Sequence, residues 1–366
     1  MRITSVNSNP NPATCSRRRL LQLAAGTVLT LLLPGCARQR QEPLPQPTVG
    51  RIDTQPYRKQ PPWHLARSGR GDVNPWMVML SAHIEYAAVE KHRHEFAVFR
   101  TASANWDPNK QIEDIQGLLA QGPDLLLVDP MDTAVVARGV RSAVDAGVPV
   151  LLVSSYVSNA PYLAWLAQPE KEHASRCVDW LLRNTAPRQI LVLSNRPASG
   201  SNPLWVAGIQ EQMATHSEVS VHIEPCHWSS AGAEAATGAL LGQGERFDGV
   251  IVRNGLIARG VVDALLERGL PIPPIAGADD WNGWLGTAKD HGVQFLALTG
   301  GANIGLHAVE MATQVLAGEG VEAYSTLPLH AFDHTELDSY HRPDLSEHYW
   351  AVHDLPEAWI ERMFSL

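Results

Sequence analysis

The sequence predicts an α/β fold of parallel, doubly wound sheets, and three observations between residues 105 and 155 support this. Apolar residues recur at helical spacing over residues 112–119, and a Gly-Pro pair ends that helix. A continuously apolar run at residues 125–128 then lies between helix breakers, which is typical of a strand buried on both faces. A second helix and a second buried strand, at residues 149–153, follow with short loops between them. This alternation indicates a parallel sheet with helices on both faces.

Length, charge and cysteine usage restrict the class of protein. With 366 residues, of which 45% are hydrophobic, the chain is long enough for two lobes or domains. The formal net charge of −9 and the absence of a long basic run argue against a nucleic-acid surface. The four cysteines form no zinc-type spacing. Cys177 and Cys226 could form a disulfide in an exported protein, but the expected state is two buried free thiols. The histidines, among them His83 and His330, form no ligand-spaced set, so no metal site is predicted.

The first 36 residues read as an export signal. Arg17-Arg18-Arg19 precedes an apolar stretch at residues 20–33 that is too short for a membrane span. The arginines resemble a twin-arginine signal, and Leu33-Pro34-Gly35-Cys36 resembles a lipoprotein lipobox. A general secretion signal with a chance Gly-Cys at its end is the alternative. The favoured prediction is lipidation of Cys36, which would anchor the chain to a membrane. Residues 37–62, rich in Pro and Gln, then read as an extended tether.

The first lobe begins after the tether. Residues 63–66 and 96–101 read as strands, and residues 76–91 between them read as a helix with Met77, Leu80 and Ile84 inward. The helices and strands of residues 105–155 follow. In open α/β sheets ligands bind outside the carboxyl ends of the strands. The loops at 69–76, 102–107, 129–132 and 154–158 are therefore the expected share of this lobe in a site.

The second lobe repeats the alternation. Strands are predicted at 190–193, 219–223, 247–252, 275–278 and 295–298, and helices at 170–183, 204–215, 258–268 and 281–291. A short strand at 162–167 leads across a first hinge near Gln168, a helix at 304–316 returns to the first lobe, and residues 327–331 make the third crossing. The residues after His334 read as irregular, with a final helix from Pro356.

These residues carry a resemblance to a known family. The pattern from Asp107 to Val150, ending in Ala146-Gly147-Val148-Pro149-Val150, resembles the ribose- and galactose-type periplasmic binding proteins, the sugar-binding subunits of bacterial ABC importers. The resemblance covers roughly residues 63–334. It implies the type I architecture, in which a hinge of three crossings joins two lobes. The expected lobes are 63–167 with about 299–327, and 168–298 with about 328–334, followed by a tail at 335–366.

The resemblance also implies a ligand site. A sugar has hydroxyl groups on its rim and C–H bonds on its faces, so it needs polar groups around it and aromatic rings against it. Trp76 and Trp228 match the stacking rings of the family, and Asn254 and Asp279 match polar ligands at the ends of second-lobe strands. Trp106 lies on a loop that should face the site.

The chain departs from the family at several site positions. Ser154-Ser155-Tyr156 stands where an Asp-Arg pair is usual, Trp205 where an Arg would follow the 194–203 loop, and Thr299-Gly300 where a Gln would lie. Ser155 and Trp205 are therefore included among the expected ligand-binding residues. A changed set of polar groups implies a ligand other than ribose, such as a deoxysugar, another pentose or a less polar solute.

Simpler interpretations of the same residues stay open. Asp279 would also suit the start of the next helix, and Asn254 would suit a turn before Gly255. Trp76 could pack on the core, and Trp106 on a neighbouring helix.

The leading functional prediction is a monomeric, lipid-anchored solute-binding protein that delivers a sugar-like ligand to an ABC permease, with no cofactor. The alternative is a periplasmic receptor of the same fold that acts on a membrane sensor kinase. An enzyme is not predicted, because the chain has no nucleophile elbow, no zinc-protease motif and no Gly-rich phosphate loop.

Overall fold

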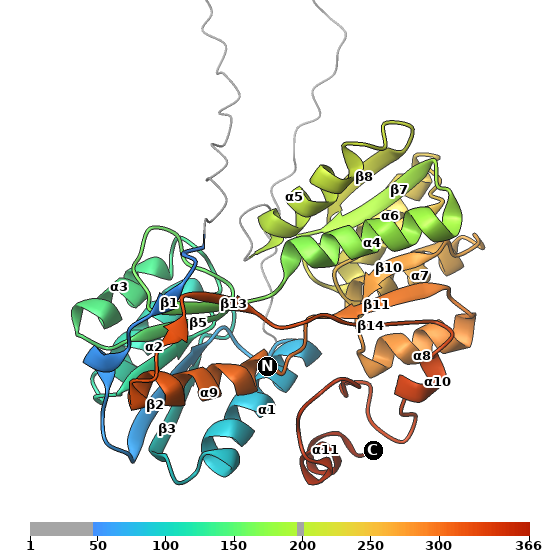
Figure 1. Ribbon diagram of the computed structural model, residues 1–366. Coiled ribbons are helices and arrows are strands. Elements are labelled where there is room, and N and C mark those ends of the chain that lie inside the picture. The colour runs from blue at the N-terminus through green and yellow to red at the C-terminus, as the bar shows by residue number, and fades with distance from the viewer. Residues whose placement is uncertain (1–46, 196–200) are drawn as a thin grey trace, which may run out of the picture. The chain divides into compact units, whose positions relative to one another are not determined.

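The computed structural model describes residues 47–195 and 201–366, and the predicted α/β fold class with two parallel sheets is confirmed (Figure 1). The predicted export signal with Cys36, and residues 37–46 of the predicted tether, lie outside the described residues. Residues 44–366 form one compact unit. In the described ranges the helices fall short of the length and apolar character that crossing a membrane would require.

The first sheet has six parallel strands in the order β13-β6-β5-β4-β2-β3. Alternate strand residues face opposite helical layers. Leu65 of β2 packs with α1 and α9, whereas Ala66 packs with α2 and α3. The strands are β2 (Trp63–Gly69), β3 (Phe96–Ser103), β4 (Leu125–Val128), β5 (Val150–Ser154), β6 (Ala164–Ala167) and β13 (Tyr324–Thr326). The helices are α1 (Pro75–Tyr86), which continues as a π-helical turn at Ala87–Lys91, α2 (Pro108–Leu119), α3 (Ala137–Asp145) and α9 (Ile304–Ala317).

The second sheet has the order β14-β11-β10-β9-β7-β8, and only β14 runs antiparallel to its neighbour. Helices α4 and α5 cover one face, and α6, α7 and α8 cover the other. The strands are β7 (Gln189–Ser194), β8 (Ser220–Pro225), β9 (Gly249–Ile251), β10 (Ile275–Ala278), β11 (Phe295–Thr299) and β14 (His330–Asp333). The helices are α4 (Glu170–Thr185), α5 (Asn202–Met213), α6 (Ser230–Gly242), α7 (Gly255–Glu267) and α8 (Asn282–His291).

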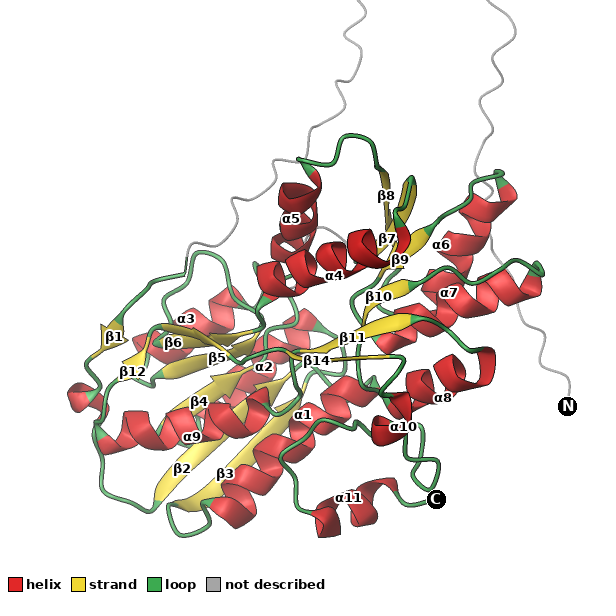
Figure 2. Ribbon diagram, turned by 45° about the vertical axis from the view of Figure 1, so that its right-hand side comes forward, coloured by secondary structure: helices red, strands yellow, loops and turns green. Residues whose placement is uncertain are grey.

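The chain passes between the two sheets three times. It crosses after β6 at residues 168–169, after β11 at 300–303 and after β13 at 327–329. Figure 2 shows the two sheets with their helical layers and the connections that join them. Three crossings permit a hinge motion of one lobe against the other.

The predicted tether at residues 37–62 needs a correction, because its C-terminal part packs on the first lobe. Strand β1 (Arg51–Ile52) pairs antiparallel with β12 (Val321–Glu322). Thr54 is fully buried, and its hydroxyl oxygen accepts a hydrogen bond from the Gly320 backbone N–H at 2.8 Å. The short 3-10 helix at Gln55–Tyr57 packs against the core of this lobe. Composition alone suggested an extended spacer, but side chains such as Arg51 and Gln55 donate to backbone carbonyls of residues 318–320.

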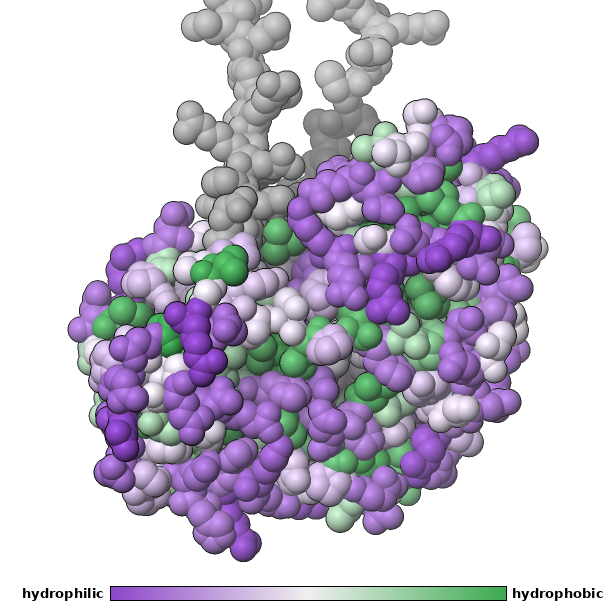
Figure 3. Space-filling view, in the orientation of Figure 1, coloured by the Kyte–Doolittle hydropathy of each residue, from purple (hydrophilic) through white to green (hydrophobic). Residues whose placement is uncertain are grey.

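The residues after β14 are more ordered than predicted. They form α10 (Leu337–Tyr340) and α11 (Glu357–Phe364), joined by a long loop, and the expected final helix is present. On the face in Figure 3 the hydrophobic patches are small and separated by hydrophilic surface. A large exposed apolar patch of the kind that marks a protein interface is not visible on that face.

Candidate functional site

A cavity of about 1050 Å³, counting the part open to solvent, lies between the two lobes. Its walls come from the loops that follow the strands of both sheets, as Arg70, Met131 and Ser155 of the first lobe and Arg253 and Asp279 of the second lobe illustrate. Ligand sites of open α/β sheets lie at these carboxyl ends. The cavity is therefore the candidate solute site.

Six of the seven expected ligand-binding residues line this cavity. They are Trp76, Trp106, Ser155, Trp228, Asn254 and Asp279. The seventh, Trp205, lies elsewhere: it is fully buried in the second-lobe core, and its indole N–H donates to Nδ1 of His173 at 3.0 Å. The ring occupies the core because α5 turns it toward α4 and away from the gap between the lobes.

The backbone is left-handed at three positions of the cavity wall. Trp106 has φ = 67°, Ser154 has φ = 66° and Trp228 has φ = 54°. Residues other than glycine rarely adopt this region, and each such residue costs on the order of 1–3 kcal/mol. The surrounding structure supports this conformation, for example through the hydrogen bond from the Trp106 N–H to the Arg70 carbonyl at 2.8 Å. Such strain is typical of functional loops, where it sets the direction of a side chain.

The polar wall of the first lobe is an ion pair between two strand ends. The guanidinium of Arg70, after β2, donates to both carboxylate oxygens of Asp129, after β4, with Nε 2.8 Å from Oδ2. It also donates to the Ser155 hydroxyl at 3.2 Å. The Gln111 carboxamide supports this corner, since it donates to the Asp129 carbonyl at 2.8 Å and accepts from the Met131 N–H at 3.0 Å. The resemblance had not indicated this pair.

The polar wall of the second lobe holds another ion pair. Arg253, after β9, donates from Nε to Oε2 of Glu170 at 3.0 Å, and Glu170 begins α4. The Ser201 hydroxyl donates to the other oxygen of Glu170. Each arginine of the cavity wall is thus paired with a carboxylate. The described lining residues therefore offer no unpaired cation for an anionic ligand.

Asp279 adds a carboxyl group that favours its neutral form. Burial, together with the adjacent Asp280, raises the pKa of Asp279 to about 8. The group is 5% exposed, and Oδ1 accepts a hydrogen bond from the Trp281 N–H at 3.2 Å. A protonated carboxyl both donates and accepts, which suits a hydroxyl partner.

Asn254 has two roles in the structure. Its Oδ1 accepts from the Ile257 N–H at 2.9 Å and caps α7, so the turn interpretation holds for that oxygen. Its Nδ2 makes no hydrogen bond within the described residues, and the residue lines the cavity. Asp279 is not the residue that caps α8, because Trp281 occupies the cap position.

The floor of the cavity is formed at two of the crossings. Gln168, after β6, lines it together with Thr299, the last residue of β11, and Gly300. Gln168 is 6% exposed, and its Oε1 has no hydrogen-bond partner among the described residues. A Gln is not present at 299–300, and the side-chain oxygen of Gln168 lies against Gly300 from another crossing. The sequence predicted a hinge near Gln168 but did not predict Gln168 as a ligand-binding residue.

Five indole rings line the cavity: Trp76, Trp106, Trp228, Trp281 and Trp350. Trp76 lies in the first turn of α1, where the Asn74 side chain caps the helix by accepting from the Met77 N–H at 3.0 Å. Trp106 is the most exposed of these rings at 40%. Trp350 comes from the C-terminal tail, and the sequence carried no signal that would place it here.

Neither a metal centre nor a disulfide is found in the described part of the chain. Groups of His, Cys, Asp or Glu suited to a metal ion do not occur there. Cys177 and Cys226 are free and buried, which confirms the expectation. Burial raises the pKa of both thiols, that of Cys226 to about 12.

Comparisons with known proteins give the family. The model of the "Periplasmic binding protein domain" family matches residues 68–320. The xylitol-binding protein of Mycolicibacterium smegmatis is 26% identical over 191 residues, 51% of this chain and 54% of the relative, so the match spans about half of that protein. The ribose import binding protein RbsB of Bacillus subtilis is 23% identical over 257 residues, which cover 70% of this chain and 82% of the relative.

A solved structure supports the fold. The periplasmic binding protein component of the arabinose ABC transporter from Shewanella sp. ANA-3, bound to L-arabinofuranose, superposes with a TM-score of 0.68 at 19% identity. The match covers 75% of this chain and 93% of that one. The family model spans more than half of the sequence, and the two-lobed fold agrees with it. The chain belongs to the periplasmic binding protein domain family.

Proposed function

We propose that this chain is the solute-binding subunit of a bacterial ABC importer and that it binds an uncharged sugar or polyol between its lobes. The main support is the chemistry of the cavity. Both arginines of its wall are neutralised by carboxylates, and the pKa of Asp279 is raised to about 8, so the lining is close to electrically neutral. Indole rings from both lobes provide the apolar surfaces that sugar C–H bonds need. The relatives named for ribose, xylitol and arabinose agree with this class of ligand.

The proposed ligand-binding residues act from both sides. Trp76, Trp106 and Ser155 belong to the first lobe, and Trp228, Asn254 and Asp279 to the second. A solute that touches both sets only when the lobes are close shifts the equilibrium toward the closed form. The permease would then distinguish the loaded form by its shape. Family membership favours binding over catalysis.

The membrane anchor is a separate part of the proposal. The leader pattern that ends at Cys36 supports lipidation of that cysteine, which would hold the protein beside its permease. Metabolic labelling with a radioactive fatty acid tests this: label should appear on the wild type and be lost in Cys36→Ala. Equal labelling of the two proteins would contradict the anchor.

A thermal-shift screen tests the ligand class. Residues 44–366 form a compact unit, so a fragment beginning at residue 44 is suitable. Each neutral solute, D-ribose, L-arabinose, xylitol and myo-inositol, is compared with a charged counterpart such as ribose 5-phosphate. At about 100 times Kd, a ligand stabilises the native state by about 2.7 kcal/mol. We expect a shift with at least one neutral solute and none with the phosphate. A larger shift with the phosphate, or none with any neutral solute, would contradict the proposal.

A further inference from the structure

Residues 335–366, here called the C-terminal strap, lie beyond the stretch that the family model matches. The strap comprises α10, a loop at residues 341–356 and α11. In Figure 1 the strap is the dark red segment that runs below α8 and ends beside α1. It follows β14, the last strand of the second sheet.

The strap is attached to the second lobe by backbone pairing. Trp350 and Trp281 form an antiparallel bridge. The Asn282 N–H donates to the Tyr349 carbonyl at 2.8 Å, and the Ala351 N–H donates to the Asp280 carbonyl at 3.2 Å. The carboxylate of Asp280 accepts from the Val352 N–H at 2.6 Å. The loop segment around Trp350 is therefore held against the strand end that carries Asp279.

The strap also contacts the first lobe. The Asp354 N–H donates to Nε2 of His83 in α1 at 3.2 Å, and the Asn303 side chain donates to the Asp354 carboxylate at 2.7 Å. The ring of Trp359 in α11 meets that of Tyr86 in α1 edge-on, with centroids 5.6 Å apart.

Apolar packing extends these contacts into a core. Met79 and Ala82 of α1 share one hydrophobic cluster with Trp350 and Trp359 of the strap, and the second-lobe helices belong to the same cluster. The opposite face of α1 packs on the first sheet. The sequence signal is that α1 is apolar on both faces, which is expected of a helix buried on both sides. The strap is thus a fourth connection between the lobes.

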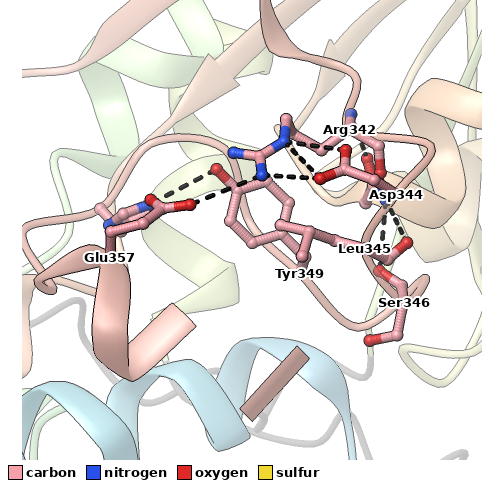
Figure 4. Close-up of polar contacts among 8 residues, drawn as sticks. Arg342, Asp344, Leu345, Ser346, Tyr349 and Glu357 are labelled. Atoms are coloured by element: carbon pink, nitrogen blue, oxygen red, sulfur yellow. Dashed lines mark hydrogen bonds and ion pairs between the residues drawn. The ribbon is translucent and has the colours of Figure 1, made fainter. Parts of the chain in front are cut away.

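An ion-pair cluster closes the loop that carries Trp350. In Figure 4 the guanidinium of Arg342 lies between the carboxylates of Asp344 and Glu357. It donates to Asp344 at 2.9 and 2.7 Å and lies 3.5 Å from Glu357 at the start of α11. Exposed pairs of this kind contribute little energy singly. Their effect here is to join the two ends of the loop.

We propose that the strap completes the solute site, with Trp350 as a specificity-determining wall, and that it couples lobe opening to solute release. The inference rests on the proposed function. Trp350 and Trp281 both line the cavity, and their backbones pair in the antiparallel bridge. Each ring also carries an N–H without an acceptor among the described residues, a donor that a solute oxygen would satisfy. Opening the lobes must stretch or release the contacts of the strap with α1, so the strap slows dissociation.

Calorimetry and stopped-flow fluorescence on the fragment from residue 44 test this with D-ribose, L-arabinose, xylitol and myo-inositol. Trp350→Ala should weaken binding of the preferred probe by ~10-fold or more and change the ranking of the four, because a buried indole is a frequent determinant of affinity. Trp350→Phe, which keeps a flat ring, should lie between wild type and Trp350→Ala. Asn303→Ala removes one strap contact with the first lobe and should speed dissociation. Met363→Ala, at an exposed strap position, is the matched control and should change nothing.

The outcomes separate the strap from the proposed function. The strap proposal is overturned if the wild type binds a solute and the Trp350 and Asn303 variants keep the wild-type affinity, solute ranking and dissociation rate. Absence of binding by the wild type overturns the proposed function instead, and hydrogen exchange without solute then decides on the strap. Amides of residues 349–354 should be protected in the wild type and less protected in Asn303→Ala. Free exchange of that segment in the wild type would exclude a strap that joins the lobes.

Discussion

The side-chain oxygen of Gln168 lies so close to the α-carbon of Gly300 that a Cβ on Gly300 would overlap it. The two residues belong to different crossings, so their contact forms the hinge-side floor of the cavity. Glycine at position 300 therefore leaves room for a polar group that arrives from another crossing.

We expect Gly300→Ala to displace the Gln168 carboxamide and weaken solute binding by about 0.5–1.5 kcal/mol, the usual net contribution of one hydrogen bond. Stability should change little, because the end of a flexible side chain can move. Calorimetry with the preferred neutral solute measures the effect. Gly117→Ala in α2, with open space around its Cβ position, is the control and should be neutral or slightly stabilising. Equal affinity of Gly300→Ala and wild type would remove Gln168 from the site.

Asp279 predicts a loss of stability as pH rises from about 4 to about 8. The folded-state pKa of about 8 lies above the ordinary value of 3.8, so the native state retains a proton that the unfolded state releases. This contribution is complete below about pH 4 and is lost as pH rises to about 8, by up to about 1.4 kcal/mol per unit. Urea unfolding of the solute-free protein between pH 5 and 9 measures the slope.

The matched variant for this prediction is Asp279→Asn. It keeps the shape of the side chain and stays neutral, so the slope should flatten while solute affinity at pH 7 stays within about threefold of wild type. Asp279→Ala should lose about 1–3 kcal/mol of binding free energy. A slope identical in wild type and Asp279→Asn would show that the carboxyl ionises normally in the fold.

His83 predicts an opposite effect on the acid side. It is fully buried in α1, Nδ1 donates to the Met79 carbonyl, and Nε2 accepts from the Asp354 N–H. Desolvation is the main cause that lowers the pKa of His83, to about 4. The nearby His353 and His307 also lower this pKa, whereas Asp354 raises it. Since the native state resists protonation, stability should fall by about 3 kcal/mol as pH drops from 6.5 to 4.

Acid unfolding of His83→Gln checks this prediction, because glutamine keeps a polar side chain without titrating in that range. The variant should lose the part of the pH dependence between pH 6.5 and 4. Protonation also removes the acceptor for the Asp354 N–H, so the protection factor of the residue 354 amide should fall in the wild type at low pH. Retention of the full wild-type dependence in His83→Gln would assign it to other groups.

The two thiols predict slow chemistry in the folded protein. Cys177 and Cys226 are fully buried, and burial raises the pKa of each, so little thiolate forms at pH 8. The native fragment from residue 44 should not react rapidly with a chromogenic thiol reagent. After urea is added, two thiols per chain should react. Rapid reaction of either thiol without urea would indicate local opening near α4 or β8.

Local pattern predicted most of the fold, and long-range contacts account for what it missed. Continuous apolar runs such as 125–128 and 275–278 mark buried strands without reference to the rest of the chain. Helix α6 was not anticipated, because its run of Ala and Gly offers weak contrast between apolar and polar faces. The docking of residues 51–57 depends on partners more than 250 residues away.

The site was predicted in part for the same reason. Trp76, Trp228 and Asp279 follow strands at positions that a motif can mark. Gln168 and Trp350 reach the cavity from a crossing and from the strap, and their neighbours in sequence do not indicate this. Trp205 stands where the family pattern has an Arg, but its ring is buried in the core, where its N–H donates to His173. The Arg70–Asp129 pair joins residues 59 positions apart, which a single sequence cannot reveal.

The most direct test of the central claim is titration calorimetry of the fragment from residue 44 with neutral sugars and polyols, in wild type, Trp76→Ala and Trp228→Ala. We expect one solute molecule per chain and a loss of at least ~10-fold in affinity in each variant, since the rings line the cavity from different lobes. Binding that neither substitution weakens would contradict a solute held between the lobes at this cavity.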